Sequence, residues 1–148
     1  MFKISKLADY AVILLTVLAK TPKTRLSSLA LKEKTSIPRP TVSKILKQLN
    51  EAGLLFSTQG TLGGYKISKN PSSITLYDII SAFDGELALT QCTQSVDMCS
   101  KTDACHLQPH WAMVNEKLHN LLLSISLEDM MRSDHSLNER KIKIGYEK

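Results

Sequence analysis

The feature that most constrains the fold of this chain is a short apolar stripe along residues 40–52, a segment that is otherwise polar. Four residues form the stripe, spaced as i, i+3, i+4 and i+7: Val42, Ile45, Leu46 and Leu49. This is the spacing of neighbours on one face of a helix. Pro40 suits the first turn of that helix, and Gly53 suits its end. The sequence therefore predicts a helix that buries one face and exposes the other.

The exposed face of this predicted helix carries small hydroxyl groups, lysines and Gln48. A second, shorter helix is predicted after Ser27, which is a good N-cap, and a tight turn at residues 37–40 joins the two. Two short helices joined in this way are typical of a helix-turn-helix, whose second helix enters the major groove of DNA. We therefore expect DNA contacts from five side chains: Arg39, Thr41, Ser43, Lys44 and Lys47.

A predicted hairpin follows this helix directly. Residues 54–58 and 65–68 have the composition of strands, and a glycine-containing turn separates them. Glycines let backbone amides approach phosphates closely, so the hairpin is interpreted as a DNA-binding wing. A hairpin with no role in DNA binding is the alternative. The residues expected to contact DNA here are Gln59, Thr61, Gly63, Gly64 and Tyr65.

The charge of the chain is unevenly distributed. Residues 1–70 contain twelve Lys and Arg against three Asp and Glu, a net charge of +9, whereas residues 71–148 carry seven against eleven, a net charge of −4. The amino-terminal half is therefore the part expected to approach a polyanion. Solvated lysines on helix faces are the alternative reading. The longest apolar stretch, residues 11–19, is too short to cross a membrane.

All three cysteines, Cys92, Cys99 and Cys105, lie within a polar segment that has no helical or strand period and is predicted to be a loop. Thiolates bind soft metals and iron-sulfur clusters, and three of them in one loop can hold a single centre. Buried structural cysteines, a disulfide and a redox thiol switch are the alternatives. The amino terminus runs into an amphipathic pattern without a signal peptide, so we expect a cytoplasmic protein with reduced thiols.

The remaining segments are predicted to be helical. Residues 5–19 form a mainly buried helix, and residues 75–83 follow a capping box. From about Pro109 a long helix carries an apolar seam with alternating steps of three and four, expected to form a dimer interface: Trp111, Val114, Leu118, Leu121 and Ile125. Packing of that seam against the chain's own core is the alternative. The tail, residues 133–148, is polar enough to be disordered.

Taken together, these motifs resemble the Rrf-two family of winged-helix regulators. The resemblance extends from Ile4-Ser5-Lys6 and Asp9-Tyr10-Ala11 through residues 40–47, Gly63-Gly64-Tyr65 and Ile79-Ile80 to the cysteines and Trp111. The family includes iron-sulfur assembly regulators of the IscR type, nitric oxide sensors of the NsrR type and regulators of the SUF assembly system. The Pro-Thr-Val-Ser-Lys helix, residues 40–44, is most similar to the SUF branch.

The resemblance implies a homodimeric transcription factor whose three cysteines ligate a 2Fe-2S or 4Fe-4S cluster. It also bears on the fourth ligand. IscR-type regulators have a histidine where this chain has Gln108, flanked by His106 and His110, whereas NsrR-type sensors use an aspartate of the partner subunit at the position of Asp9. Asp9 is therefore the favoured fourth ligand. Gln59 and Ser43 replace an arginine and an acidic residue of relatives, so operator preference does not transfer.

The expected fold is mainly α with a small β wing, a winged helix-turn-helix followed by a long C-terminal dimerisation helix. Residues 1–70 form the DNA-binding region, 71–90 a connecting helix, 91–108 the cysteine loop, 109–132 the dimerisation helix with a short helix, and 133–148 the tail. The expected function is that of a cluster-sensing repressor of iron-sulfur assembly genes that binds double-stranded operator DNA. The alternative is thiol redox or nitric oxide sensing without a stable cluster. An enzyme is not expected, because no orienting carboxylate or pocket accompanies Cys105.

Overall fold

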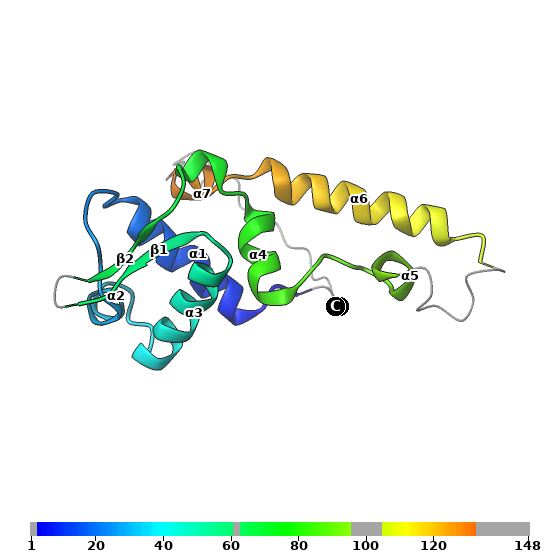
Figure 1. The fold of residues 1–148 in the computed structure, drawn as a ribbon. Coiled ribbons are helices and arrows are strands. Elements are labelled where there is room, and N and C mark those ends of the chain that lie inside the picture. Colours follow the sequence, from blue (N-terminus) through cyan, green and yellow to red (C-terminus); the bar gives the residue numbers. More distant parts are fainter. Residues whose placement is uncertain (1–2, 61–62, 96–104, 133–148) are drawn as a thin grey trace, which may run out of the picture.

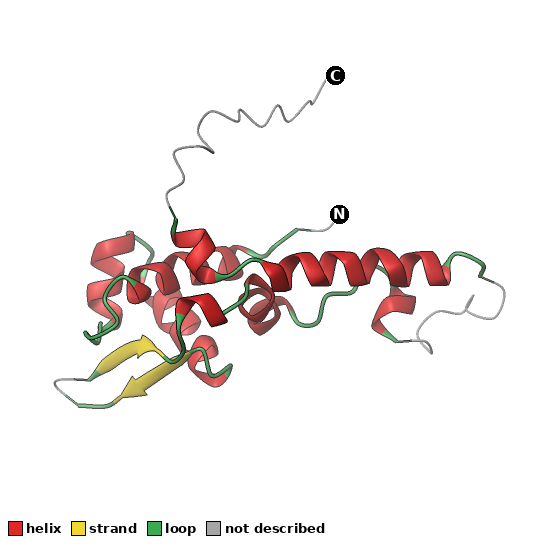
Figure 2. Cartoon of the chain, turned by 90° about the horizontal axis from the view of Figure 1, so that it is seen from above, coloured by secondary structure: helices red, strands yellow, loops and turns green. Residues whose placement is uncertain are grey.

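The structure is a computed structural model that describes residues 3–60, 63–95 and 105–132. It is mainly helical, with one two-stranded sheet (Figures 1 and 2). The elements are α1 (Lys6–Ala19), α2 (Ser28–Thr35), α3 (Arg39–Glu51), β1 (Leu55–Thr58), β2 (Gly64–Ile67), η1 (Pro71–Ser73), α4 (Leu76–Asp84), α5 (Gln91–Gln94), α6 (Gln108–Ser124) and α7 (Leu127–Met131). No described helix is both long and apolar enough to cross a membrane.

The apolar stripe of α3 forms the centre of the core, as its spacing predicts. Its four residues have no exposed surface, and they pack with fully buried leucines from the neighbouring helices α1 and α2, among them Leu14, Leu15 and Leu31. Each such side chain contributes about 1.5–3 kcal/mol relative to an exposed one. This burial fixes the polar face of α3 toward solvent.

The predicted cap at Ser27 and the predicted helix end at Gly53 are both present, and Ser5 caps α1 in addition. The hydroxyl of Ser5 accepts a hydrogen bond from the N–H of Ala8, and that of Ser27 accepts from Ala30, both at 3.1 Å. Gly53 has a φ of +72° after α3, a conformation that favours glycine. Ser36 ends α2 with a φ of 58°, which turns the chain tightly into α3.

The wing is an antiparallel hairpin in which Leu55 pairs with Ile67 and Thr58 with Gly64. A third segment joins its edge, because the backbones of Leu26 and Tyr65 exchange hydrogen bonds of 3.0 and 2.9 Å. A Cβ at residue 63 would collide with the carbonyl oxygen of Thr58, and Gly64 has a φ of +151° beside the backbone of Leu26. These two glycines are therefore required by the hairpin itself, whatever they contact outside it.

The C-terminal elements return to the core. The N–H of Leu127 donates to the carbonyl of Ile74 at 2.8 Å, and the N–H of Leu76 donates to that of Ile125 at the same distance. These bonds hold α7 beside η1, and α7 also packs on α1, with Leu127 fully buried. Figure 1 shows α6 running from this point to the far end of the molecule, where α5 lies beside it.

The segment after Thr90 differs from the expected loop. Its first four residues form the one-turn helix α5, in which the N–H of Ser95 donates to the carbonyl of Gln91 at 3.1 Å. A single turn is too short to show a period in the sequence, which is why the pattern predicted a loop there. Residues 96–104 and the tail, residues 133–148, lie outside the described residues.

Candidate nucleic-acid interface and cysteine site

The outward face of α3 carries the side chains expected to meet DNA. Arg39, Ser43, Lys44 and Lys47 are exposed, and Thr41 is half-buried. The ammonium of Lys47 lies 3.9 Å from the carboxylate of Glu51, one turn further along the helix. A surface pair of this kind is weak, but it partly satisfies the charge of Lys47. Lys44 forms no ion pair with a described residue, so it presents a full positive charge to solvent.

Gln48 corrects one detail of the expected outward face. The side chain is half-buried, and its amide oxygen Oε1 is buried without a hydrogen-bond partner in the described part of the chain. The residue lies at the edge of the stripe, two positions from Leu46 and one from Leu49, where helical spacing alone does not decide burial. Gln48 therefore belongs to the packing of α3 and is less available to a groove.

The wing places its expected contact residues unequally. Gln59 is exposed, Gly63 and Gly64 are half-buried, and Thr61 lies outside the described residues. Tyr65 is half-buried against the core, so much of its ring supports the hairpin. A shallow groove separates the outer half of the wing, near its turn, from the start of α2 and is lined in part by Ser27 and Ser28. Sequence reasoning used Ser27 only as a cap and missed this groove, since its two sides are distant in the chain.

Two of the three cysteines lie in described residues, and both are half-buried without a disulfide there. Cys92 is on α5, where its Sγ lies 3.1 Å from the hydroxyl of Thr90. Cys105 precedes the start of α6 by three residues, and Cys99 falls in residues 96–104, outside the described part. Within the described ranges, no three His, Cys, Asp or Glu side chains are grouped to hold a metal ion.

One chain alone does not contain the complete expected site, because its fourth ligand, Asp9, is expected from the partner subunit. Asp9 is exposed on α1, which packs with α2, α3, α4, α7 and β2, whereas α5 packs on α6. His106 and His110 are exposed near Cys105. An aspartate on the outer surface of α1 is available to another chain.

The segment that leads to Cys92 is fastened to α6 by one side chain that sequence reasoning missed. The amide of Asn115 donates from Nδ2 to the carbonyl of Leu87 at 3.1 Å, and its Oδ1 accepts from the N–H of Leu89 at 3.0 Å. One turn further along α6, the ring of His119 meets Tyr77 of α4 edge to face at 4.2 Å. These contacts connect α4, the segment before α5 and α6.

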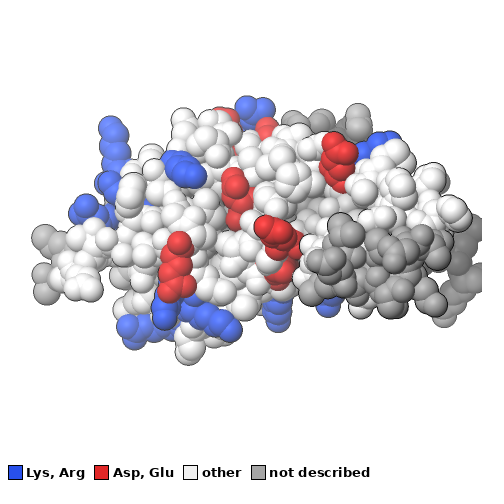
Figure 3. Space-filling view, turned by 45° about the vertical axis from the view of Figure 1, so that its right-hand side comes forward, with Lys and Arg blue, Asp and Glu red and all other residues white. Residues whose placement is uncertain are grey.

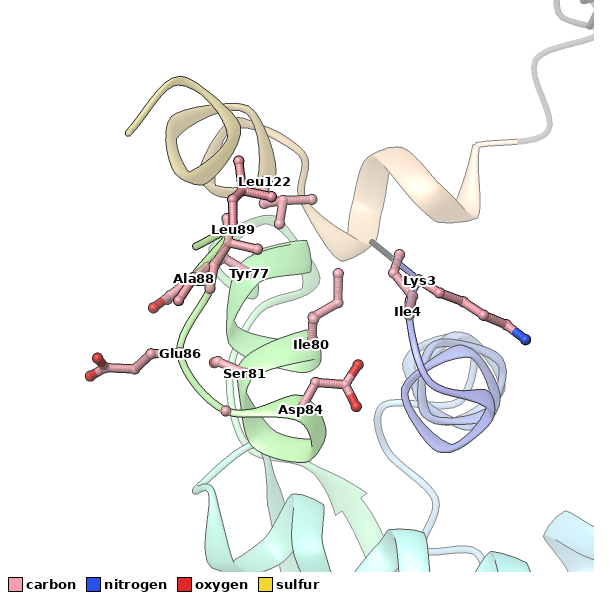
Figure 4. Close-up of a pocket in the computed structure, with 12 residues that line it drawn as sticks. Lys3, Ile4, Tyr77, Ile80, Ser81, Asp84, Glu86, Ala88, Leu89 and Leu122 are labelled. Carbon is pink, nitrogen blue, oxygen red and sulfur yellow. The ribbon is translucent and has the colours of Figure 1, made fainter. Parts of the chain in front are cut away.

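A cavity of about 380 Å³ opens beside this connection (Figure 4). Its walls come from α4, residues 85–89, the amino-terminal residues and Leu122. At its edge, the carboxylate of Asp84 accepts a hydrogen bond of 3.0 Å from the N–H of Ser5. The cavity therefore lies where the start of α1 approaches the segment before the cysteines.

The expected dimer seam of α6 is largely uncovered. Trp111 and Val114 are each 42% exposed and Leu121 is 54% exposed, whereas Leu118 is half-buried. Ile125 is not part of the helical seam as predicted, because α6 ends at Ser124 and the backbone of Ile125 is extended. The adjacent face of the helix carries Leu122, which is only 6% exposed. One face of α6 thus packs against the chain's own core, and most of the seam is exposed to solvent.

A helix-turn-helix with an exposed, positively charged second helix and a wing defines the molecule as a DNA-binding transcriptional regulator. Lys and Arg side chains gather at the left-hand part of the molecule, along its lower side and at its upper left (Figure 3). The model of the Rrf2 (Rrf-two) family, described as an iron-dependent transcriptional regulator, matches residues 4–133. The chain belongs to this family, whose members are regulators and not enzymes.

Individual relatives agree with this assignment. The chain is 28% identical over 106 residues to the HTH-type transcriptional regulator IscR of Xenorhabdus nematophila, a match covering 72% of this chain and 64% of that regulator. The structure of T. potens IscR superposes with a TM-score of 0.65 and 26% identity, covering 92% of this chain and 90% of the other. CymR, the global cysteine regulator of B. subtilis, superposes with a TM-score of 0.69 at 23% identity, covering 88% and 97%, and shares the fold.

Proposed function

We propose that this regulator is a homodimeric repressor of iron-sulfur assembly genes, similar in type to the SUF-system regulators, and that an iron-sulfur cluster on its cysteines sets its affinity for operator DNA. The observation that carries the proposal is the position of the cysteine segment. It begins on α5 and ends just before α6, the helix that packs on α5 and α4 and bears the exposed apolar seam. A change at the cysteines would therefore act on the helix expected to join two subunits.

The donor chemistry fits such a cluster. Cys92 and Cys105 are half-buried thiols without a disulfide in the described residues, and Cys99 supplies a third sulfur within the same segment. Three cysteines can hold a 2Fe-2S or 4Fe-4S cluster if one further ligand comes from elsewhere. When bound, the cluster would supply a centre that reacts with oxygen or nitric oxide. Asp9 of the partner subunit is the proposed fourth ligand, because this carboxylate is exposed on α1.

The DNA-binding face consists of α3 and the wing. Arg39, Thr41, Ser43, Lys44 and Lys47 are the proposed groove and phosphate contacts of α3, and Gln59, Thr61, Gly63, Gly64 and Tyr65 those of the wing. Support comes from the burial of the opposite face of α3, which leaves its hydroxyls and lysines outward, and from the exposed position of Gln59. In this proposal, the dimer has two arrangements, and the cluster makes different contacts in each. Binding or loss of the cluster would therefore change the distance between the two α3 helices of the dimer.

The test is anaerobic purification followed by an absorption spectrum and an assay of iron and acid-labile sulfide. We expect a coloured protein with iron and sulfide in equal amounts, and loss of both in each of the variants Cys92→Ala, Cys99→Ala and Cys105→Ala. Asn120→Ala, at an exposed position of α6, is the control and should keep the colour. Colourless anaerobic protein without iron or sulfide would contradict the proposal and favour thiol redox or nitric oxide sensing without a stable cluster.

A further inference from the structure

A row of two cations and one aromatic ring crosses the outer face of the wing. Phe56 pairs with Lys66 across the hairpin. The antiparallel pairing of Leu26 with Tyr65 places Arg25 beside Lys66 on the other side. Arg25, Lys66 and Phe56 therefore stand next to one another on the same face, because residues directly opposite in antiparallel strands share a face.

This row has no internal compensation. No described carboxylate forms an ion pair with Arg25 or Lys66. Like charges directly opposite one another in a sheet are destabilising. The ammonium of Lys66 lies 5.8 Å from the ring centre of Phe56, which is itself 56% exposed. Arg25 and Lys66 also line a surface hollow together with Lys23. None of the residues that line this hollow is acidic: Pro22, Lys23, Thr24, Arg25 and Lys66.

The row lies on the opposite side of the wing from α3. The other face of the hairpin, which carries Leu55 and Ile67, packs on α3 and α1. Figure 3 accordingly shows Lys and Arg on both the lower side and the upper left of the molecule. Positive charge therefore flanks the wing on two sides.

We propose that Arg25 and Lys66, assisted by Lys23, bind the DNA phosphate backbone on the side of the wing away from α3. A wing that enters the minor groove, which is about 6 Å wide, has a phosphate strand on either side. The outer face of α3 approaches one strand, and this row meets the other. Phosphate would also relieve the repulsion between Arg25 and Lys66. The exposed ring of Phe56 offers apolar surface to the deoxyribose beside it. These contacts position the protein and carry no base preference of their own.

The inference rests on the proposed DNA-binding face, so the test also measures Lys44→Ala, a variant of that face. The ligand is a duplex of about 30 base pairs, roughly three helical turns, selected from a random library by the wild-type protein. The variant is Arg25→Gln/Lys66→Gln. The matched control is Lys69→Gln/Lys117→Gln, which removes the same charge from two exposed lysines outside the row. Affinity is measured by fluorescence anisotropy as a function of salt concentration.

For the row variant, we expect the slope of log affinity against log salt to fall in magnitude by about 1.8, or about 0.9 for each phosphate that the protein no longer neutralises. If wild type and variant bind equally at 1 M salt, this slope corresponds to roughly a 30-fold loss at 0.15 M. The sequence preference should be unchanged, and the control should keep the wild-type slope. The melting temperature should not fall, because two repelling charges have been removed, so weaker binding cannot come from unfolding.

The outcomes separate the two proposals. If Lys44→Ala weakens binding while Arg25→Gln/Lys66→Gln leaves the salt slope unchanged, the inference is wrong. The row would then not contact DNA, and an acidic protein surface would be the alternative ligand. If neither variant weakens binding, the proposed DNA-binding face fails as well. A fall in slope equal to that of the control would also overturn the inference, because it would reflect net charge alone.

Discussion

At the scale of the residue, Lys44 and Lys47 should differ although both are lysines on the outer face of α3. Lys47 is 3.9 Å from Glu51, whereas Lys44 forms no ion pair with a described residue. We expect Lys44→Ala to weaken operator binding and to reduce the salt slope by about 0.9, with a smaller effect for Lys47→Ala. Lys44→Glu should weaken binding more than either. Anisotropy titrations at several salt concentrations measure this, and equal affinities for all three variants and wild type would remove α3 from the interface.

Asp9 gives the second prediction at this scale. If Asp9 of the partner subunit is the fourth ligand, Asp9→Ala should retain a labile cluster whose reactivity toward oxygen or nitric oxide differs from wild type. Replacement of a cysteine should abolish the cluster instead. The decay of the absorption spectrum after exposure to air measures the difference. An unchanged decay in Asp9→Ala, together with loss of the cluster in His106→Ala or His110→Ala, would assign the ligand to a histidine.

At the scale of the element, Asn115 is expected to hold the segment before Cys92 to α6. Asn115→Leu removes both hydrogen bonds and leaves the N–H of Leu89 and the carbonyl of Leu87 without that partner. A buried group left unpaired costs about 1–3 kcal/mol, and because these groups are part-buried the cost should lie toward the lower end of that range. We expect a lower melting temperature and a less stable cluster. Asn120→Leu, at an exposed position of the same helix, is the control and should change neither. Equal behaviour of the two variants would show that the connection has no such role.

The cap of α7 gives a prediction about pH. The carboxylate of Asp129 accepts hydrogen bonds from the hydroxyl and the backbone N–H of Ser126, and these bonds, the hydroxyl's first, lower the pKa of Asp129 below its usual 3.8. The positive charge of Arg132 lowers this pKa further, and slight desolvation of the carboxylate opposes the shift. A depressed pKa in the folded state adds stability above the unfolded pKa, and this stability is lost as the pH falls through the folded value. Asp129→Ala should therefore lower the melting temperature at neutral pH. The difference from wild type should shrink below about pH 4. A difference independent of pH would contradict the role of the carboxylate.

The caps also show which parts of the structure a sequence can predict. The bonds of Ser27 and the Thr75–Asp78 capping box join residues three apart, so the local sequence was sufficient to predict them. The apolar stripe of α3 was predicted for the same reason. Asn115 was missed because its partners are 26 and 28 residues away. The hollow beside the wing was missed because residues 22–25 and Lys66 are joined only by tertiary pairing.

At the scale of the whole molecule, the cysteine site remains the least predictable part. Local chemistry names three candidate sulfur donors, but the geometry of the proposed site would depend on α5, α6 and a second chain. The fold of each chain fixes only where the site begins and ends, at Cys92 on α5 and Cys105 before α6. A shared ligand would couple the two chains through the cluster. In the proposed function, subunit association is therefore the property on which both DNA binding and cluster binding would depend.

The seam of α6 allows that association to be tested without disturbing the fold. Leu118 is half-buried, so a charge there would also weaken the chain's own packing; Leu121 is 54% exposed and avoids this difficulty. We expect Leu121→Asp to convert a dimer into a monomer in light scattering, because an unpaired charge in an apolar interface is costly. The monomer should bind operator DNA weakly, since two half-sites are then read separately. Met113→Asp, on an exposed part of α6 off the seam, should remain dimeric. A Leu121→Asp protein that stays dimeric and binds DNA as wild type does would place the interface elsewhere.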